Sequence, residues 1–584
     1  MSWHSMNPLL KIEDLSLEFR RDTQWNPILH HINLSLDKGE VLGIVGESGS
    51  GKSVTALSVM QLLNPNVTRY PSGKILFRTH DDDKLPALDI LKASESAMQS
   101  LRGNQIGMIF QEPMTSLNPV IRCGEQISEQ ILLHKHVSKK EAKEQVLSLF
   151  NEVMLPRPDQ IFESYPHELS GGQKQRIMIA MAMSCNPKLL IADEPTTALD
   201  VTIQKNILEL IRSLQQKHGM SVLFITHDLG VMAEVADRTI VMYKGDIVEE
   251  NTVRNIFLNP QNPYTKQLIA CRPSMSQRLK TLPQVSDFAG NDDNAVQDII
   301  TKLTVKPEER KTAHETLYSG DKIVTIKNLN KVYKLRKRKL FEKQQFLHAL
   351  KDINLDIYEG ETLGLVGESG CGKTTLGRTL LRLIEPSSGE VCFRGKNLVR
   401  ISTSELREMR KDLQIILQDP YSSLNQRLTI GEALLEPMRV HGILHNDKER
   451  KKRVIELLER ISLNESHFYR YPHEFSGGQR QRISIARALS VNPKFIICDE
   501  SVSALDVSVQ AQVLNLLNEL KAEYHFTYIF ISHDLSVVKF MADRIAVMQQ
   551  GAIVEIGEAD ALCNHPQTSY TQKLIDSIPK GIVS

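Results

Sequence analysis

Two short stretches decide the fold of this chain: GESGSGKS at residues 46–53 and GESGCGKT at residues 367–374. Both fit the pattern G-x-x-x-x-G-K-[ST], whose glycines let the backbone curl so that successive N–H groups point toward a phosphate. Each stretch follows a short apolar run, at 41–45 and 363–366, and precedes a segment with a helical pattern. The sequence therefore predicts a strand, a phosphate-binding loop and a helix at two places in one chain.

The rest of the chain is also written twice. YPHELSGGQKQR at 165–176 returns as YPHEFSGGQRQR at 471–482, and ITHDL at 225–229 returns as ISHDL at 531–535. Lys52 and Lys373 are 321 residues apart, whereas Gln111 and Gln418 are 307 apart, so the first copy holds about 14 extra residues between them. The polar stretch at 79–84 and its flank are the expected place for this surface insertion.

These repeats predict two domains of one type, at residues 8–270 and 322–580, joined by a polar linker at 271–321. Unbroken apolar runs at 189–193, 221–226, 495–499 and 527–532 are typical of strands buried on both faces of a sheet. Residues 120–168 and 427–474 have mostly helical patterns and are expected to form a helical subdomain in each copy. The predicted fold class is α/β.

Composition excludes several classes of protein. The chain has 584 residues, with 71 Lys plus Arg against 70 Asp plus Glu, so no broad basic surface for nucleic acid is expected. The seven cysteines form no CxxC pair, so neither a disulfide framework nor a zinc site is indicated. We expect no signal peptide and no membrane-spanning helix, because no apolar stretch is long enough.

The residues expected to carry chemistry recur at matching positions. The acid pairs Asp193-Glu194 and Asp499-Glu500 end apolar runs; the first acid of each would hold Mg²⁺ and the second would polarise the attacking water. Their alternative role is that of strand-end carboxylates facing solvent. His227 and His533 also end apolar runs, as structural residues or as contacts to the γ-phosphate. Lys52 and Lys373 would reach the phosphates, and the hydroxyls of Ser53 and Thr374 would ligate Mg²⁺.

Together these motifs, with LSGGQ at 169–173 and FSGGQ at 475–479, resemble those of ATP-binding cassette (ABC) ATPases. The resemblance implies two tandem P-loop NTPase domains, each a RecA-like α/β core with an antiparallel β subdomain and a helical subdomain. It also implies that the two cassettes of the chain pair, so that the Ser-Gly-Gly-Gln of one caps the ATP held by the other. The residues then expected to bind ATP are Gly46, Glu47, Ser48, Gly49, Ser50, Gly51, Lys52, Ser53, Gly367, Glu368, Ser369, Gly370, Cys371, Gly372, Lys373, Thr374, Ser170, Gly171, Gly172, Gln173, Ser476, Gly477, Gly478 and Gln479.

Further roles follow from the resemblance alone. Gln111 and Gln418 match the glutamine that links Mg²⁺ to a transmembrane partner, which completes a metal set of Ser53, Gln111, Asp193, Thr374, Gln418 and Asp499. Phe19 and Tyr333 match the aromatic residue that stacks on adenine, although Phe19 fits a core position equally well. The second copy has Ser501 where the first has Pro195. Because Glu500 is kept, we expect both sites to hydrolyse ATP, with Glu194, Glu500, His227 and His533 as the catalytic residues.

The extended motifs indicate one branch of the family. QEPMTSLNP at 111–119, QDPYSSLNQ at 418–426 and NPYT at 262–265 resemble importers of dipeptides, oligopeptides and nickel. Two cassettes on one chain resemble the fused ATP-binding subunits of importers for glutathione and, next, for microcin C-type peptides. Many members of this branch bind an iron–sulfur cluster through a Cys-rich loop near this motif. Only Cys271 lies there in this chain, so no cluster is expected.

The resemblance implies the energy-coupling subunit of a peptide importer, with glutathione as the preferred cargo and other short peptides or nickel as alternatives. Its expected partners are two transmembrane permease subunits and a substrate-binding protein, and its expected location is the cytoplasmic face of a bacterial inner membrane, as a peripheral protein. The competing hypothesis is a soluble tandem cassette ATPase that acts on ribosomes or DNA. Near-neutral charge and the absence of paired cysteines count against that hypothesis.

Overall fold

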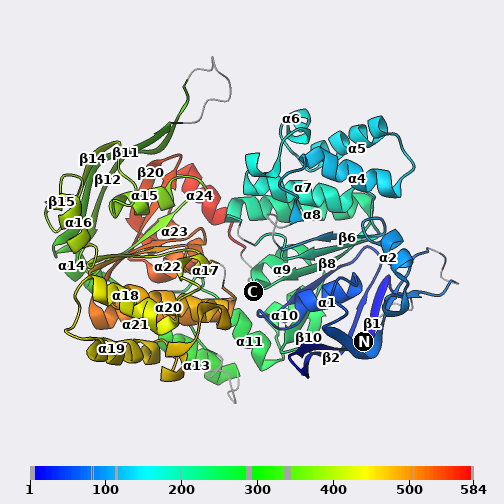
Figure 1. The fold of residues 1–584 in the computed structure, drawn as a ribbon, viewed down its shortest axis with the longest axis horizontal. Helices are drawn as coiled ribbons and strands as arrows, with labels where there is room; N and C mark the ends of the chain where they lie inside the picture. Colours follow the sequence, from blue (N-terminus) through cyan, green and yellow to red (C-terminus); the bar gives the residue numbers. More distant parts are fainter. Residues whose placement is uncertain are drawn as a thin grey trace. The chain divides into compact units, whose positions relative to one another are not determined.

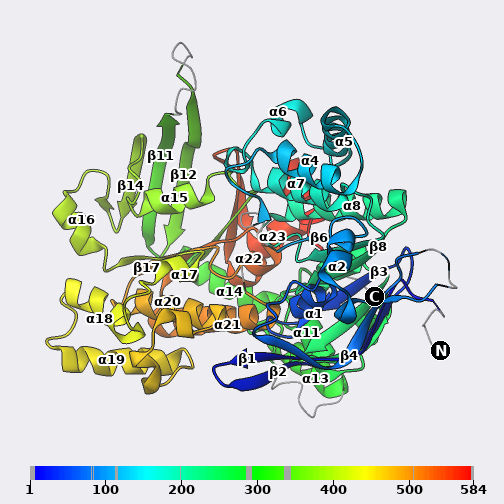
Figure 2. The same cartoon turned by 45° about the vertical axis from the view of Figure 1, so that its right-hand side comes forward.

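The computed structural model describes residues 7–80, 82, 85–111, 116–197, 199–284, 293–334, 344–503 and 505–579, with the side chains of 293–297 and 420 left aside. By internal contacts the chain divides into two compact units. Unit 1 comprises residues 1–199, 203–269 and 579–584, and unit 2 comprises 200–202 and 270–578. Figures 1 and 2 show the elements of each unit, which are described separately below.

Unit 1 contains two sheets. The larger has the order β10-β9-β3-β8-β7-β6, in which all neighbours are parallel except the edge strand β10. The smaller is antiparallel, with the order β2-β1-β4-β5. A single apolar core joins them, because side chains such as Leu10 and Ile12 pack in one cluster with Leu42 and Ile44. The strands are β1 (Leu10–Arg21), β2 (Gln24–Leu36), β3 (Val41–Val45), β4 (Thr68–Phe77), β5 (Leu88–Asp89), β6 (Ile106–Ile109), β7 (Leu189–Asp193), β8 (Ser221–Thr226), β9 (Arg238–Tyr243) and β10 (Asp246–Thr252).

Four helices of unit 1 lie together at the end of the unit away from β1 and β2 (Figures 1 and 2): α4 (Cys123–His134), α5 (Lys139–Glu152), α6 (Pro158–Phe162) and α7 (Gly171–Met183). A capping box at Ser138 and Glu141 fixes the start of α5, since each side chain bonds the other's backbone N–H. The remaining helices follow strands of the larger sheet: α1 (Lys52–Val59), α8 (Val201–His218), α9 (Leu229–Val235), α10 (Val253–Leu258) and α11 (Pro263–Ala270), with α2 (Glu95–Leu101) before β6.

Unit 2 repeats both sheets in the same order. Its larger sheet is β16-β17-β18-β13-β19-β20 and its antiparallel sheet is β12-β11-β14-β15. A second apolar cluster joins the two sheets. The strands are β11 (Lys322–Lys334), β12 (Phe346–Tyr358), β13 (Thr362–Val366), β14 (Ser388–Phe393), β15 (Lys396–Asn397), β16 (Leu413–Ile416), β17 (Phe495–Asp499), β18 (Thr527–Ile531), β19 (Arg544–Gln549) and β20 (Ala552–Glu558).

The helices of unit 2 also match those of unit 1. The separate helical group contains α17 (Pro420–Ser423), α18 (Ile430–Val440), α19 (Asp447–Arg460) and α20 (Gly477–Leu489). The others are α15 (Lys373–Leu380), α16 (Thr403–Met409), α21 (Val507–Tyr524), α22 (Leu535–Met541), α23 (Ala559–Asn564) and α24 (Ser569–Asp576). Each unit is therefore an α/β core with an antiparallel sheet and a helical subdomain, the arrangement that the resemblance of the motifs implied.

The segment 271–321, predicted to be a polar linker, has helical structure of its own. It contains two helices, α13 (Asp293–Leu303) and α14 (Pro307–Tyr318), and it belongs to unit 2. No residue of α14 is fully buried, so the helix has no apolar face. Its sequence therefore lacks the apolar periodicity from which a helix could have been predicted. Polar contacts with β20 and α23 stabilise it instead, among them Arg310 with Glu558 and Asp560. Of the surface insertion expected at 79–84, residues 81, 83 and 84 lie outside the described residues.

Within the part of the chain that the structure describes, no helix is both long and apolar enough to cross a membrane.

Candidate functional site

The phosphate loop of each unit connects a buried parallel strand to a helix. In unit 1 the loop leaves β3 and enters α1 at Lys52; in unit 2 the corresponding loop leaves β13 and enters α15 at Lys373. Lys52 Nζ donates to the carbonyl oxygens of Gly46 and Glu47, at 2.7 and 2.8 Å. Lys373 makes the same two contacts to its loop. The lysines therefore hold both loops in a curled form, with the helix N-terminus directed at its centre.

Steric constraints explain why glycine occupies two positions of the loop motif. A Cβ on Gly46 would lie 2.2 Å from the carbonyl oxygen of Met242, and a Cβ on Gly367 would lie 2.3 Å from that of Met548. Gly51 precedes α1 with φ of 104°, a left-handed conformation that an L side chain rarely adopts. The motif glycines are thus needed for the close approach of the loop to β9 or β19 and for the turn into the helix.

A tyrosine hydroxyl forms a hydrogen bond with each phosphate loop, a contact that was not predicted from the sequence. The hydroxyl of Tyr264 accepts a hydrogen bond from the N–H of Glu47 at 3.2 Å, and that of Tyr570 accepts one from Glu368 at 3.1 Å. Tyr264 belongs to the NPYT motif at 262–265, which served above only to indicate a branch. Tyr570, in SYT at 569–571, occupies the matching place in the second copy, and this repetition was the sequence feature that could have indicated a role for both tyrosines. Both tyrosines satisfy a loop N–H beside the first glycine and fix the loop to the C-terminal part of its cassette.

The first acid of each pair meets the hydroxyl that follows the loop lysine. Ser53 Oγ donates to Asp193 Oδ1 at 3.0 Å, and Thr374 Oγ1 donates to Asp499 Oδ1 at the same distance. Both carboxylates are buried. Burial, reinforced by the charge of Glu194 and opposed by the Ser53 hydrogen bond, raises the pKa of Asp193 to about 6. Burial also raises the pKa of Asp499.

The second acid has the opposite electrostatic setting. His227 Nδ1 lies 3.2 Å from Glu194 Oε2, and Gln111 Nε2 donates to the same oxygen at 3.1 Å. Burial alone would raise the pKa of Glu194, but the hydrogen bond and charge of His227, with the charge of Lys52, lower it to about 2. The neighbouring carboxyls of Asp193 and Glu194 therefore have pKa values shifted in opposite directions. Glu194 is ionised throughout the physiological pH range.

Unit 2 keeps this arrangement around Glu500. Gln418 Nε2 donates to Glu500 Oε2 at 2.7 Å, and His533 Nδ1 lies 3.7 Å from the same oxygen. Burial opposes ionisation of Glu500, but His533 and Lys373 together lower its pKa. Glu194 and Glu500 also share a left-handed backbone, with φ of 47° at both positions. Such a conformation is uncommon for glutamate and persists where the surroundings enforce it.

The two units differ in one contact of this carboxylate. Thr197 Oγ1 donates to Glu194 Oε2 at 2.9 Å, whereas the matching Ser503 donates to the backbone carbonyl of Glu500 at 3.0 Å. The side chain of Glu194 therefore has one more donor than that of Glu500. Where unit 1 has Pro195, unit 2 has the buried side chain of Ser501.

The residues of unit 1 fit a nucleotide and a magnesium ion. Ser50 Oγ in the loop is buried and has no hydrogen-bond partner among the described residues, so it can donate to a phosphate oxygen. Ser53 and Asp193 present hydroxyl and carboxylate oxygens side by side, the ligand type that Mg²⁺ prefers. The amide nitrogens of Gln111 and Gln418 donate to Glu194 and Glu500 in this structure, and their role as metal ligands stays a prediction.

The Ser-Gly-Gly-Gln segments form exposed helix starts. Ser170 caps α7 and Ser476 caps α20, each in a reciprocal capping box with the glutamine three residues later. Both serines are exposed. A capped N-terminus with glycines in its first turn offers backbone donors and a positive dipole end, which suits an anion.

The two candidate adenine-stacking residues lie on antiparallel strands. Phe19 is on β1 and packs against the apolar core of unit 1. Tyr333 is on β11, half-buried, with the ammonium of Lys331 4.9 Å from its ring centre. Phe19 is only partly buried, so stacking on adenine and packing against the core both stay predictions for it.

Comparison with known proteins identifies the family. The family model described as ABC transporter matches residues 29–197 and 350–503, together more than half of the chain. The chain belongs to the ABC transporter family. A second model, described as the oligopeptide/dipeptide transporter C-terminal region, matches residues 248–295 and 554–581. These two segments contain Tyr264 and Tyr570, the tyrosines that bond the phosphate loops.

Relatives of this ABC transporter chain match it almost from end to end. The glutathione import ATP-binding proteins GsiA of Escherichia coli O157:H7 and Shigella dysenteriae serotype 1 (strain Sd197) are each 47% identical to it over 571 residues. The alignments cover 98% of this chain and 89% of each relative. A solved dimeric cassette with bound ADP and phosphate is 32% identical, with a TM-score of 0.37 over 40% of this chain and 98% of that one.

Membership of the ABC transporter family gives the loops and acid pairs their chemical context. The chain is an ATPase, and it is the ATP-binding subunit of an ABC importer. The fold class and the family expected from the sequence are thereby confirmed.

The raised pKa of Asp193 predicts a pH-dependent affinity for Mg²⁺. A carboxylate must lose its proton before it binds a cation, so protons compete with Mg²⁺ below a pH of about 6. We expect the Mg²⁺ affinity of unit 1, with nucleotide bound, to fall about tenfold between pH 7 and pH 5. Manganese titration followed by electron paramagnetic resonance measures it. The Asp193→Asn protein should bind weakly at both values; an equal tenfold change in that variant would contradict the assignment.

The hydroxyls of Tyr264 and Tyr570 predict a second result. Removing one neutral hydrogen bond to a loop N–H costs about 1 kcal/mol, so Tyr264→Phe and Tyr570→Phe should each weaken ATP binding at the affected loop about fivefold. Fluorescent-nucleotide titration measures the dissociation constant. Tyr469→Phe is the matched control, because its hydroxyl accepts a hydrogen bond from Lys451 on an exposed surface. A lowered melting temperature with unchanged affinity would mean that the tyrosines only stabilise the fold.

Proposed function

We propose that this chain hydrolyses ATP at both cassettes to drive the import of glutathione. The observation that carries the hydrolytic part is the duplicated surrounding of Glu194 and Glu500. Glu194 is buried and Glu500 is partly buried; both are ionised, and each is contacted by one histidine and one glutamine side chain. The cargo rests on the two glutathione import relatives, whose similarity extends over 98% of this chain.

At each site the proposed division of labour follows from the pKa values. Glu194 and Glu500 are ionised and so can accept hydrogen bonds from, and orient, an attacking water. His227 and His533 hold these carboxylates and stand beside the γ-phosphate position. Lys52 and Lys373, with the loop N–H groups, stabilise phosphate charge, while Ser53–Asp193 and Thr374–Asp499 hold Mg²⁺. Magnesium, when bound, neutralises charge between the β- and γ-phosphates.

The proposal includes composite sites. ATP on the Lys52 loop would be capped by Ser476–Gln479, and ATP on the Lys373 loop by Ser170–Gln173. The support is the exposed, capped start of each signature helix and the resemblance to the family. Phe19 and Tyr333 would stack on the two adenines.

The same proposal supplies the partners and the location. Two permease subunits would span the membrane, and a substrate-binding protein would deliver the cargo. The chain would then sit as a peripheral protein on the cytoplasmic face of a bacterial inner membrane. Gln111 and Gln418 stand at the start of the segments expected to transmit closure to the permeases; residues 112–115 of the first lie outside the described residues.

Uptake measurements test the cargo and the chemistry together. In a strain lacking the gene, the wild-type chain should restore uptake of radiolabelled glutathione. The Glu194→Gln and Glu500→Gln proteins should each reduce ATP hydrolysis and uptake about a hundredfold, because the remaining amide cannot orient water as a carboxylate does.

Two controls separate the parts of this proposal. Glu359→Gln removes an exposed carboxylate that pairs with Arg394, and it should leave both activities unchanged. Restored uptake of dipeptides or nickel without glutathione would overturn the cargo and keep the ATPase. Full hydrolysis by both glutamine variants would overturn the catalytic roles.

Composite sites predict that damage to one signature is felt at the other loop. Ser476→Arg should lower vanadate-trapped photolabelling by azido-ATP at the loop containing Lys52 more than at the loop containing Lys373, by roughly tenfold. Peptide mapping of the label gives the ratio between loops, and Ser170→Arg should change that ratio in the opposite sense. The pairing would be contradicted if the ratio stayed unchanged, or if each variant lost label mainly at the loop of its own cassette.

A further inference from the structure

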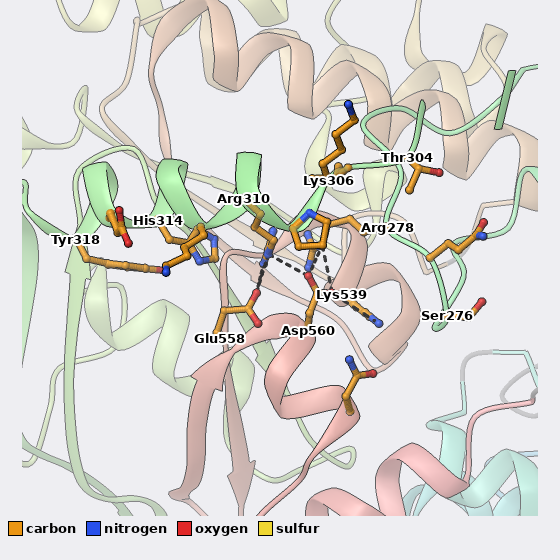
Figure 3. Close-up of a pocket in the computed structure, with 16 residues that line it drawn as sticks. Ser276, Arg278, Thr304, Lys306, Arg310, His314, Tyr318, Lys539, Glu558 and Asp560 are labelled. Atoms are coloured by element: carbon orange, nitrogen blue, oxygen red, sulfur yellow. Dashed lines mark hydrogen bonds and ion pairs between the residues drawn. The ribbon is translucent and has the colours of Figure 1, made fainter. Parts of the chain in front are cut away.

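Unit 2 contains a cavity of about 810 Å³ that none of the chemistry above uses. One side is formed by the segment that precedes the second cassette, namely residues 276–278, 304–307 and α14. The other side is formed by Lys539 of α22, Glu558 at the end of β20, and Asp560 and Asn564 of α23. Figure 3 shows Arg310 on α14 reaching toward Glu558 and Asp560, with His314 and Tyr318 farther along the same helix. The cavity thus lies where the linker helix meets the cassette.

Three cations line its inner wall. The side chains of Arg278, Arg310 and Lys539 are only 11%, 15% and 5% exposed. All three approach one carboxylate, Asp560, at 3.0, 2.9 and 3.6 Å, and Arg310 also pairs with Glu558 (Figure 3). The three nearly buried positive charges therefore share two carboxylates, Asp560 and Glu558.

Arg278 is the least satisfied of these cations. Its Nε donates to Asp560 and its Nη1 to the carbonyl oxygens of Phe540 and Ala542. Its Nη2 is buried and has no hydrogen-bond partner among the described residues. Burial and the neighbouring charge of Arg310 lower the pKa of Arg278 in spite of Asp560. A buried guanidinium nitrogen without an acceptor is costly, and a shift of the Arg278 side chain toward an anion in the cavity would satisfy it.

The charges of the whole lining favour a ligand with both signs. Arg278, Lys306, Arg310, Lys311 and Lys539 give five positive charges against three negative ones from Glu315, Glu558 and Asp560, an excess of two. Lys306, Lys311 and Glu315 are exposed at the rim, whereas the inner charges are shielded from water. Val305 and Pro307 add apolar surface. A simple inorganic anion would use only part of this lining.

We propose that this cavity binds a short acidic peptide, a molecule with two carboxylates and one ammonium group. One carboxylate would pair with Arg278 and Arg310 at the inner wall, and the other with Lys306 or Lys311 at the rim. The ammonium group would face Glu315 or Glu558. Pairing of guanidinium with carboxylate is charge-assisted and directional, so it favours this ligand over a neutral peptide.

The position of the cavity connects it to the second ATP site through one short helix. α22 begins directly after His533-Asp534, and His533 contacts Glu500. Lys539 is in the last turn of the same helix and lines the cavity. A ligand that contacts both Lys539 and α14 therefore touches the helix that directly follows the histidine of the second cassette.

Glutathione is the probe of choice, since it has two carboxylates and one ammonium group; this choice rests on the proposed function, whereas the cavity does not. Isothermal titration of the purified full chain, with MgADP at saturation so that the phosphate loops are filled, measures its binding. Glutathione should bind, and neither dialanine nor inorganic phosphate should bind with comparable affinity. Phosphate binding equal to that of glutathione would reduce the cavity to a simple anion site and overturn the proposal.

Variants locate the binding. Arg310→Gln should weaken glutathione binding at least tenfold, and Val305→Trp, which fills the cavity without removing a charge, should do the same. Lys280→Gln is the control, because Lys280 pairs with Glu309 on the linker surface outside the cavity. No binding by the wild-type chain, or equal binding by Val305→Trp, would overturn the site. Binding in a chain that fails to restore glutathione uptake would overturn the proposed function and keep the site.

Discussion

The rest of the structure depends on one close approach, between the first glycine of each phosphate loop and the strand beside it. At Gly46 and Gly367 there is no room for a Cβ, because a backbone carbonyl of β9 or β19 occupies that space. The loop can then curl over its own lysine and enter the helix through a second glycine. A buried parallel sheet below the loop provides the rigid floor that this geometry needs.

The acid pairs depend on the same sheet. β7 and β17 end beside the loops, which brings Asp193 to Ser53 and Asp499 to Thr374 although each pair is more than a hundred residues apart. Adjacent carboxyls then acquire opposite pKa shifts: burial dominates for the first acid, and histidine and lysine charges dominate for the second. Two neighbouring residues of one type can therefore take separate roles, one toward a metal ion and one toward water.

The duplicated cassettes are not electrostatically identical. Thr197 bonds the carboxylate of Glu194, whereas Ser503 bonds only the backbone of Glu500. Unit 2 alone includes the helical linker segment, whose arginines bind its α23. The second cassette thus has polar contacts from the linker segment, which lies outside the sequence repeat.

The repeated glycine, lysine and acidic motifs predicted the family and the α/β fold, because such motifs reflect local requirements of the backbone; the same motifs supplied the proposed site residues. The sequence did not reveal the bonds from Tyr264 and Tyr570 to the loops, the left-handed glutamates or the helices of the linker. Those features depend on contacts between residues far apart in the chain. Only the tertiary structure decided which charges share a buried space, since desolvation and pairing are set by distance in the fold and not by spacing along the sequence.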